Sequence, residues 1–472
     1  MLMYKFQMEK VNILWFRRDL RTRDNPILFI KDSTKVLPIF IFDKNILKNL
    51  NPEDRRISFL FDQVLNLKKE LKDKNLDLAL FFGTPANVFD YLCTMFDIFN
   101  IYSSSDNDPY SKERDNQIHK LFNLKIVHDN FLLQPETIKS KDGKSYTVFT
   151  HFKNAVSPIV ELFRNYQIPS HFPQFKLAEY QNFNQIIEVE NGQANPKPIE
   201  ITSLGFKRTK IEFEGALKTP QQLLSDFEKI ADNYDKIRNF PSVRGTSLLS
   251  VHLRFGTISI RELFRWALEK NYNSFVSELI WREFFNYILF NFPETINENL
   301  QKNIKVEWKN NLNDFEKWKN GETGIPLVDA GIRELVQTGY MHNRVRMVVA
   351  SLLTKNLLID WKLGEEFFAE YLFDYETSSN IGNWQWVAGV GTDPRSATRI
   401  FNPFIQSKKF DPDCQYIYKY VPELKNIPPD SIHSYDFIFN NKIPNYSKPI
   451  IKDLNATRIE FFRAYKKIKE EK

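Results

Sequence analysis

The sequence predicts a doubly wound α/β domain followed by a large, all-helical domain. Three observations carry this prediction: apolar runs alternate with amphipathic stretches in the first third, a polar stretch rich in Pro and Gly follows, and long segments of helical periodicity come after it. We therefore place an α/β domain at residues 1–140, an interdomain linker at 141–215 and a helical domain at 216–472.

The first domain shows a strand and helix rhythm typical of a parallel, Rossmann-like sheet. Short apolar runs predict strands, and the amphipathic stretches between them predict crossover helices. The expected strands are 12–16, 36–42, 76–81, 100–103 and 124–127, and the expected helices are 55–72, 86–96 and 111–122. Ligands of such sheets bind beyond the carboxyl ends of the strands, so the turn after residue 16 and the segment 103–110 are candidate contacts.

The linker and the second domain differ in their periodicity. The linker carries Pro169, Pro173, Pro196 and Pro198 with little regular spacing, which favours an irregular surface segment. Beyond it, apolar residues recur at helical spacing. The expected helices include 260–269, 274–291, 325–338 and a charged terminal helix at 455–472.

Composition excludes several classes of protein. Of 472 residues, 42% are hydrophobic and 15% aromatic, enough for large cores, and no apolar run approaches a membrane span. Cys93 and Cys414 are too few for a disulfide framework and lie in no metal-ligand spacing, so we expect no metal. We expect a cytoplasmic monomer without an obligate protein partner; the net charge of +6 suits a phosphate-bearing partner if it gathers on one face.

Residues 374–386, DYETSSNIGNWQW, are the most informative segment of the chain. Ordinary core helices carry Leu, Ile and Val, whereas this segment combines two acids, an amide and two tryptophans. Such groups suit a flat ligand that stacks and accepts hydrogen bonds. The alternative is a loop between helices with incidental tryptophans.

The flanks of that segment, together with motifs elsewhere, resemble the DNA photolyase and cryptochrome family. The resemblance covers about residues 11 to 425. The motifs are, in chain order, 15–21 (WFRRDLR), 244–250 (RGTSLLS), 278–284 (ELIWREF), 341–347 (MHNRVRM), 358–361 (LIDW), 374–386, 391–393 (GTD) and 399–403 (RIFNP).

The resemblance implies that the helical domain binds flavin adenine dinucleotide (FAD). On sequence alone the segment 246–250 reads as a helix N-cap, whereas in the family it binds the pyrophosphate of FAD. Arg346 would pair with Asp374 beside the flavin ring, and Asn380 would lie against its central nitrogen. The implied FAD contacts are Tyr234, Thr246, Ser247, Leu248, Leu249, Ser250, Arg282, Asn343, Arg346, Asp374, Glu376 and Asn380.

Three tryptophans match the family's chain of electron carriers. By default tryptophans are core or rim residues, and composition does not connect Trp308, Trp361 and Trp384. The resemblance implies that Trp384 lies nearest the flavin, followed by Trp361 and then an exposed Trp308. Their expected role is to pass electrons inward when oxidised flavin is excited.

A further set is implied to bind damaged DNA. Trp281 and Trp386 would wall a cavity for a flipped-out pyrimidine dimer, with Met347 touching the lesion. Glu278, desolvated between indoles, would stay protonated and donate to a thymine carbonyl. The alternative interpretation of Glu278 is a buried acid with a structural capping role. The expected contacts to the DNA backbone, each otherwise a solvated side chain, are Arg238, Arg344, Arg399, Gln406 and Lys408.

The resemblance thus implies a light-driven lyase that splits cyclobutane pyrimidine dimers in UV-damaged DNA. Asn343 to Met347 and Trp386 favour this class over six-four enzymes, although residues 389–395 have a DASH-like pattern, which leaves the preference for single or double strands open. A blue-light receptor of the same fold is the main alternative. A second, antenna chromophore (deazaflavin, folate or flavin) is implied near residues 106–110 and 114–115, and Glu376 stands where Asp is usual.

Overall fold

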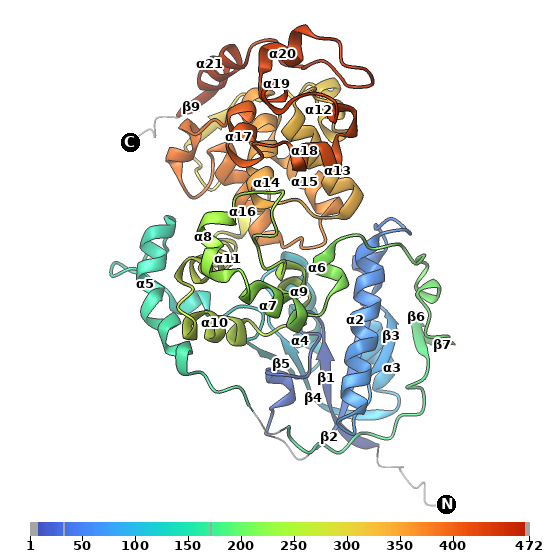
Figure 1. The fold of residues 1–472 in the computed structure, drawn as a ribbon. Coiled ribbons are helices and arrows are strands. Elements are labelled where there is room, and N and C mark those ends of the chain that lie inside the picture. The colour runs from blue at the N-terminus through green and yellow to red at the C-terminus, as the bar shows by residue number, and fades with distance from the viewer. Residues whose placement is uncertain (1–7, 32–33, 170–171, 468–472) are drawn as a thin grey trace, which may run out of the picture. The chain divides into compact units, whose positions relative to one another are not determined.

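The computed structural model describes residues 8–31, 34–169 and 172–467, which form two compact units (Figure 1). The first unit is drawn from Met1–Gln134, Ile159–Ile211 and Ser250–Lys270, and the second from Pro135–Pro158, Glu212–Leu249 and Asn271–Lys472. The chain therefore crosses between the units several times, and the stretch predicted as a linker contributes to both of them.

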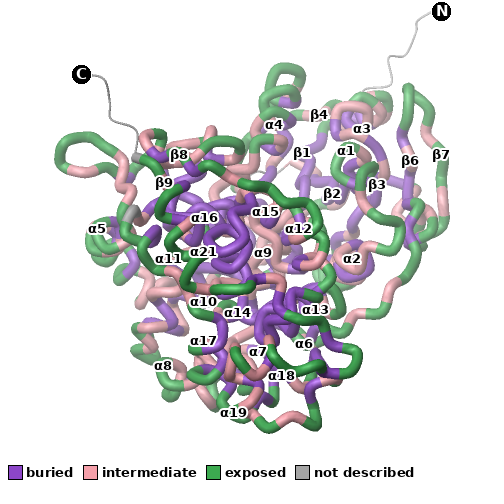
Figure 2. The backbone as a smooth tube through the Cα atoms, turned by 90° about the horizontal axis from the view of Figure 1, so that it is seen from above, coloured by how far each residue is buried: buried purple, intermediate pink, exposed green. Residues whose placement is uncertain are grey.

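A mostly parallel sheet forms the centre of the first unit. Its strand order is β5-β4-β1-β2-β3-β6-β7, and only the last pair, β6 and β7, is antiparallel. β1 is buried along almost its whole length, as expected for a strand covered on both faces (Figure 2). The strands are β1 (Glu9–Phe16), β2 (Lys35–Asp43), β3 (Ala79–Gly83), β4 (Phe96–Ser104), β5 (Leu124–Val127), β6 (Ile186–Glu190) and β7 (Gln193–Lys197).

The predicted doubly wound sheet is confirmed, with differences at the ends of elements. α2 (Arg55–Lys72) begins and ends where expected, and Asp54 caps it by accepting the N–H of Arg56. α3 (Pro85–Leu92) is shorter than expected, because Phe96 already belongs to β4. The other helices of this unit are α1 (Lys44–Leu47), α4 (Pro109–Leu121), α9 (Ser250–Phe255) and α10 (Ile260–Glu269).

The second unit is helical, as predicted, apart from a short antiparallel pair of strands, β8 (Ile304–Val306) and β9 (Tyr465–Lys467). The tail expected to be helical from residue 455 leaves the helix at Tyr465 to make this pair, and residues 468–472 lie outside the described part. The helices are α5 (Phe149–Glu161, which begins here), α6 (Glu214–Leu217), α7 (Pro220–Glu228), α8 (Tyr234–Ile237), α11 (Asn273–Asn291), α12 (Leu312–Lys319), α13 (Pro326–Thr338), α14 (Asn343–Ser351), α15 (Trp361–Tyr371), α16 (Thr377–Ala388), α17 (Pro403–Phe410), α18 (Gln415–Tyr420), α19 (Pro429–Ile432), α20 (Tyr435–Asn440) and α21 (Leu454–Ala464).

Two glycines allow α16 to pack deep in the helical unit. A Cβ on Gly382 of α16 would overlap the ring of Phe285 on α11, and a Cβ on Gly364 of α15 would overlap the ring of Trp384 on α16. Both backbones therefore approach an aromatic ring more closely than any other residue would permit. Among the described residues, no helix combines the length and the apolar character needed to cross a membrane.

Candidate functional site

The start of α14 is fixed by a buried histidine. His342 is the N-cap: its Nδ1 accepts the N–H of Arg344 at 3.2 Å, and its own backbone N–H donates to the carboxylate of Glu334 at 3.2 Å. Burial, together with the nearby charges of Arg346 and Arg344, lowers the pKa of His342 to about 4, so the ring is neutral and able to accept. The first turns of α14 are thereby held in one orientation.

Arg346 and Asp374 form the ion pair that the sequence suggested. One guanidinium nitrogen, Nη2, lies 2.9 and 3.1 Å from the two carboxylate oxygens, and Nε donates to the carbonyl of Met341 at 2.6 Å. The guanidinium also lies 5.4 Å from the ring centre of Tyr340. Burial opposes the charge of Arg346, but Asp374 outweighs it and raises the pKa of the arginine.

A cleft with about 550 Å³ of empty space opens between α14, α15 and α16. Its walls combine amides and paired charges with apolar side chains, the mixture found in cofactor sites. The cleft brings together seven residues that the sequence singled out: Asn343, Arg346, Met347, Asp374, Glu376, Asn380 and Trp384.

Asn380 is oriented by a residue that the sequence analysis missed. Its amide nitrogen donates to the carboxylate of Glu365 at 2.9 Å and to the Glu365 carbonyl at 3.2 Å. Burial raises the pKa of Glu365 despite the hydrogen bonds that it receives from Asn380 and Tyr375. Glu365 lies one helical turn after Trp361 on α15, a spacing that could have drawn attention to it. Glu376 reaches Arg282 at 3.5 Å, so the longer acid still has a cationic partner.

Two of the three matched tryptophans, Trp361 and Trp384, are buried, and Trp308 is partly exposed. Trp384 lines the cleft and makes an edge contact with Phe368, with ring centres 4.9 Å apart. Trp361 is 1% exposed and donates through Nε1 to Asn299 at 3.1 Å. Gly364, which contacts Trp384, lies three residues after Trp361, so α15 connects these two indoles.

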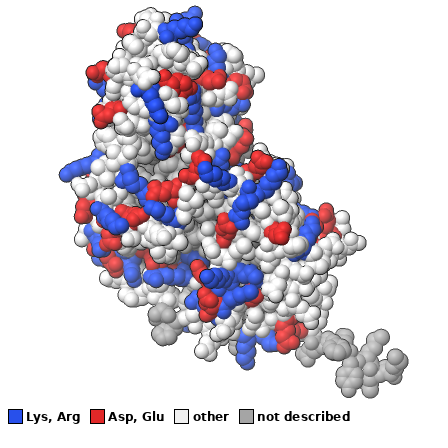
Figure 3. Space-filling model, turned by 45° about the vertical axis from the view of Figure 1, so that its right-hand side comes forward, with Lys and Arg blue, Asp and Glu red and all other residues white. Residues whose placement is uncertain are grey.

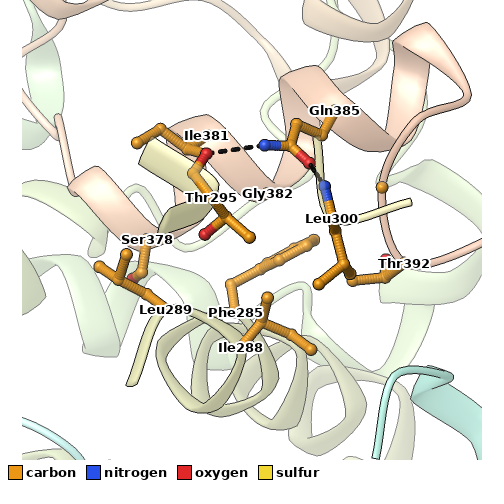
Figure 4. A pocket seen from close by; sticks show the side chains of 11 residues that line it. Phe285, Ile288, Leu289, Thr295, Leu300, Ser378, Ile381, Gly382, Gln385 and Thr392 are labelled. Carbon is orange, nitrogen blue, oxygen red and sulfur yellow. Dashed lines mark hydrogen bonds between the residues drawn. The ribbon is translucent and has the colours of Figure 1, made fainter. Parts of the chain in front are cut away.

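A small pocket lies on the side of α16 that faces away from the cleft (Figure 4). It holds Gln385, the residue between Trp384 and Trp386, which is 2% exposed. Its amide nitrogen donates to the carbonyl of Thr295 at 2.7 Å, and its amide oxygen accepts the N–H of Leu300 at 2.9 Å. With Gln385 held on this side, Trp384 faces the cleft, and Trp386 is partly exposed beneath Arg399.

The expected pyrophosphate segment lies directly before α9. Leu248 adopts a left-handed backbone conformation with φ 53°, which is rare for a branched residue and marks a turn under constraint. Ser247 Oγ accepts the N–H of Leu249 at 3.3 Å, and Tyr340 interacts with the hydroxyl of Thr246. Ser250 begins α9 and belongs to the other unit.

The environment of Glu278 differs from the one expected. The sequence placed this carboxyl between two indoles, where it would remain protonated. Instead Arg238 donates to it at 2.6 Å, and this pairing raises the pKa of Arg238 against the effect of burial. Both side chains are partly exposed, so Glu278 lies in an ion pair near the surface and not between two indoles.

Trp281 is stacked within the protein. Its ring lies parallel to that of Phe149 from α5, with centres 3.6 Å apart and planes at 6°. Phe285, one turn along α11, is 5.5 Å away at 28°. Sequence reasoning did not identify Phe149, because it lies in the segment predicted as linker.

The expected DNA contacts lie at the surface of the helical unit. Asn239 accepts from Arg344 at 2.8 Å and directly follows Arg238, so these two arginines are neighbours. Arg399 and Lys408 are mostly exposed, with carboxylates at 3.7 Å, while Gln406 is only partly exposed. Lys and Arg are interspersed with Asp and Glu over the face drawn in Figure 3, so the positive charge does not gather there.

The first unit carries a polar cluster where the antenna site was expected, at the carboxyl ends of its strands. Arg17 pairs with Asp115 at 2.6 Å and Arg18 with Asp106 at 3.0 Å. Tyr110 donates to Asp43 at 2.6 Å. The cluster thus unites the turn after β1, the end of β2 and the start of α4.

The cleft suits a flavin by the chemistry of its walls. Its amides and its Arg346–Asp374 pair offer both donors and acceptors, and Met347, Leu372 and Trp384 offer apolar surface. The fold and the site together define a class: a helical unit built to hold a flavin, joined in one chain to a doubly wound α/β unit.

Comparison with known proteins agrees with this class. A family model described as the FAD binding domain of DNA photolyase matches residues 275–467, and one described as DNA photolyase matches residues 12–173. A deoxyribodipyrimidine photo-lyase of Halobacterium salinarum is 32% identical, covering 93% of this chain and 96% of its own. The chain therefore belongs to the DNA photolyase family, and FAD is its cofactor.

Solved structures show the same fold. A photolyase from Sulfolobus tokodaii, described with two FAD molecules, has a TM-score of 0.78 and 32% identity, covering 96% of this chain and 99% of its own. A cryptochrome from Synechocystis has a TM-score of 0.79 and 25% identity, covering 97% and 99% respectively. The family thus contains both photolyases and a cryptochrome at similar structural distance.

Proposed function

We propose that this protein is a light-driven lyase that splits cyclobutane pyrimidine dimers in DNA. The observation that carries the proposal is the cleft, which places Asn380, Met347 and Trp384 on its walls beside the Arg346–Asp374 pair. When bound and reduced, FAD supplies the absorbed light and the electron that open the cyclobutane ring, and because the electron returns, no net redox change results.

The cleft residues have distinct proposed roles toward the cofactor. Arg346 and Asp374 hold opposite charges at the wall, and Asn380 presents an amide whose orientation is set by Glu365. Met347 lies on the same face of α14 as Asn343 and so lines the side at which the dimer would enter. Electrons would pass inward from Trp308, which is partly exposed, through buried Trp361 to Trp384 at the cleft.

Recognition of the lesion would require an exchange of partners. Arg238 donates a hydrogen bond to the carboxylate of Glu278. If Arg238 instead binds a phosphate, the carboxyl of Glu278 leaves this pair and becomes free to contact a dimer carbonyl. Trp281 and Trp386 would flank the dimer, with Phe149 supporting the ring of Trp281.

The decisive experiment is a repair assay on an oligonucleotide that contains one thymine dimer, single- or double-stranded, in light and in darkness. We expect repair in light only, and loss of most of it in Glu278→Ala and Trp281→Ala. Lys305→Ala, on the exposed face of β8, serves as a control that should repair normally. Repair that persists in both variants would show that the lesion binds elsewhere.

The same assay tests the alternative function of a blue-light receptor, which is suggested by the structural similarity to a cryptochrome. A receptor would bind FAD and respond to light, yet leave the dimer intact. The polar cluster of the first unit is the proposed place for a second chromophore, and the absorption spectrum of the purified protein would reveal one besides FAD.

A further inference from the structure

A buried lysine outside the cleft is unexplained by the roles assigned so far. Lys355 is 1% exposed and lies in a π-helical turn, Leu352–Asn356, which continues α14. Single π-turns within helices occur frequently at functional sites. Burying an amine is costly unless its N–H groups are satisfied, and a Leu or Met would pack here without that cost. The lysine must therefore do something that an apolar side chain cannot.

Its amine holds a separate segment of main chain. Nζ donates to the carbonyl of Ser396 at 2.6 Å and to that of Arg399 at 3.0 Å. Four residues earlier, on the same helical face, Ser351 Oγ accepts the N–H of Phe401 at 3.3 Å. Two neighbouring side chains thus fix the segment 396–401 at three backbone atoms.

The segment held in this way presents Arg399 to the solvent. The main chain of Arg399 is fixed, but its side chain is 55% exposed and lies over the ring of Trp386, with the guanidinium carbon 5.9 Å from the ring centre. Ala397, in the same segment, packs so closely on Gly389 that a Cβ there would meet it at 2.8 Å. Arg399 and Trp386 therefore form a preset pair.

Electrostatics around Lys355 favours a tether made of hydrogen bonds rather than of an ion pair. Burial, with a further contribution from Arg399, lowers the pKa of Lys355 to about 7. Its partners among the described residues are carbonyls and the ring of Phe461, 5.7 Å from Nζ. Both the ammonium and the neutral amine carry enough N–H groups to keep the two bonds.

We propose that Lys355 is a positioning residue for the binding of damaged DNA. It fixes the main chain of segment 396–401, so that Arg399 already lies over Trp386 when the DNA binds. This rests on the proposed function, because the ligand is the dimer-containing strand. The same helical run lines the cleft with Met347, eight residues before Lys355, so one continuous helical segment connects the two sites.

The test uses Lys355→Met in the full-length, FAD-bound protein, since Met fills a similar apolar volume without donors. We expect the Kd for an oligonucleotide with one thymine dimer to rise about tenfold, while repair at saturating DNA and FAD content stay unchanged. Amide hydrogen exchange in segment 394–401 should become faster even without DNA. Lys305→Met, an exposed lysine, should change none of these.

A double-mutant cycle separates positioning from general stability. Arg399→Ala should weaken binding to a similar extent, and adding Lys355→Met to it should cost little more, because the lysine acts through that arginine. Ser351→Ala, which removes one of the three contacts, should show the same changes on a smaller scale and covers the case in which Lys355→Met does not fold. Fully additive losses, or unchanged affinity and exchange in Lys355→Met, would overturn the proposal.

A wild type that binds damaged and undamaged DNA equally would count against the proposed function instead. Amide hydrogen exchange would still report whether Lys355 holds the segment.

Discussion

The cleft and the side chains proposed to contact DNA differ in how far they are prepared for a ligand. In the cleft, Arg346 is already bound to Asp374, and Asn380 is already oriented by Glu365. At the proposed DNA contacts, Glu278 is paired with Arg238 and Trp281 is stacked on Phe149. The pairs in the cleft are preorganised for a cofactor, whereas the pairs made by Glu278 and Trp281 would have to be exchanged if these side chains bind DNA as proposed.

The largest effect is expected when the cleft loses the negative charge of its ion pair. Asp374→Ala leaves Arg346 without its counter-charge in a largely buried setting, which we expect to cost about 3 kcal/mol and most of the bound FAD. FAD absorbance and urea unfolding measure both. Asp430→Ala, whose partner Lys408 is exposed, should cost less than about 0.5 kcal/mol. Equal effects of the two substitutions would mean that the cleft pair is no more than a surface contact.

Acidification should loosen the cleft through His342. In the folded state its pKa is about 4, against an ordinary 6.5, so the unfolded chain binds more protons between these values. The stability due to neutral His342 is complete above pH 6.5 and is lost as pH falls toward 4, by up to about 3 kcal/mol. His342→Asn keeps a capping side chain and should flatten this part of the profile in urea unfolding, whereas exposed His119→Asn should not. A wild-type profile that is already flat would refute the role.

Gly364→Ala tests how closely the cleft is packed. The added methyl group would overlap the ring of Trp384, which we expect to cost about 2 kcal/mol and to displace the indole. Photoreduction of oxidised FAD should then be slower, as measured by its absorbance under blue light. Glu366→Ala, exposed on the same helix, is the matched control. Unchanged photoreduction in Gly364→Ala would remove Trp384 from the electron route.

The smallest effect is expected at the proposed DNA contacts, from Phe149→Leu. Losing the stacked ring removes about 1 kcal/mol of support for Trp281, so affinity for dimer-containing DNA should fall about fivefold while FAD content is unchanged. Phe439→Leu removes a stacked ring from Tyr435 on α20 and should leave DNA affinity as it was. Full affinity in Phe149→Leu would indicate that Trp281 needs no support.

The sequence by itself predicted five strands of the sheet, the helical unit and the family. Periodicity located α2 and α10 with their ends, because each apolar stripe lies within one continuous segment. Motifs such as DYETSSNIGNWQW identified the residues of the cleft, since α14 and α16 carry their polar groups at helical spacing. Local patterns were sufficient where function and folding use the same short segment.

Tertiary structure alone decided several partnerships that no sequence motif indicated. The pairing of Glu278 with Arg238, the stacking of Phe149 on Trp281 and the reach of Lys355 to Ser396 each join residues about 40 to 130 positions apart. No periodicity encodes such contacts, because they depend on how helices far apart in the chain pack together. For the same reason the predicted linker supplied strands β6 and β7 to one unit and the start of α5 to the other.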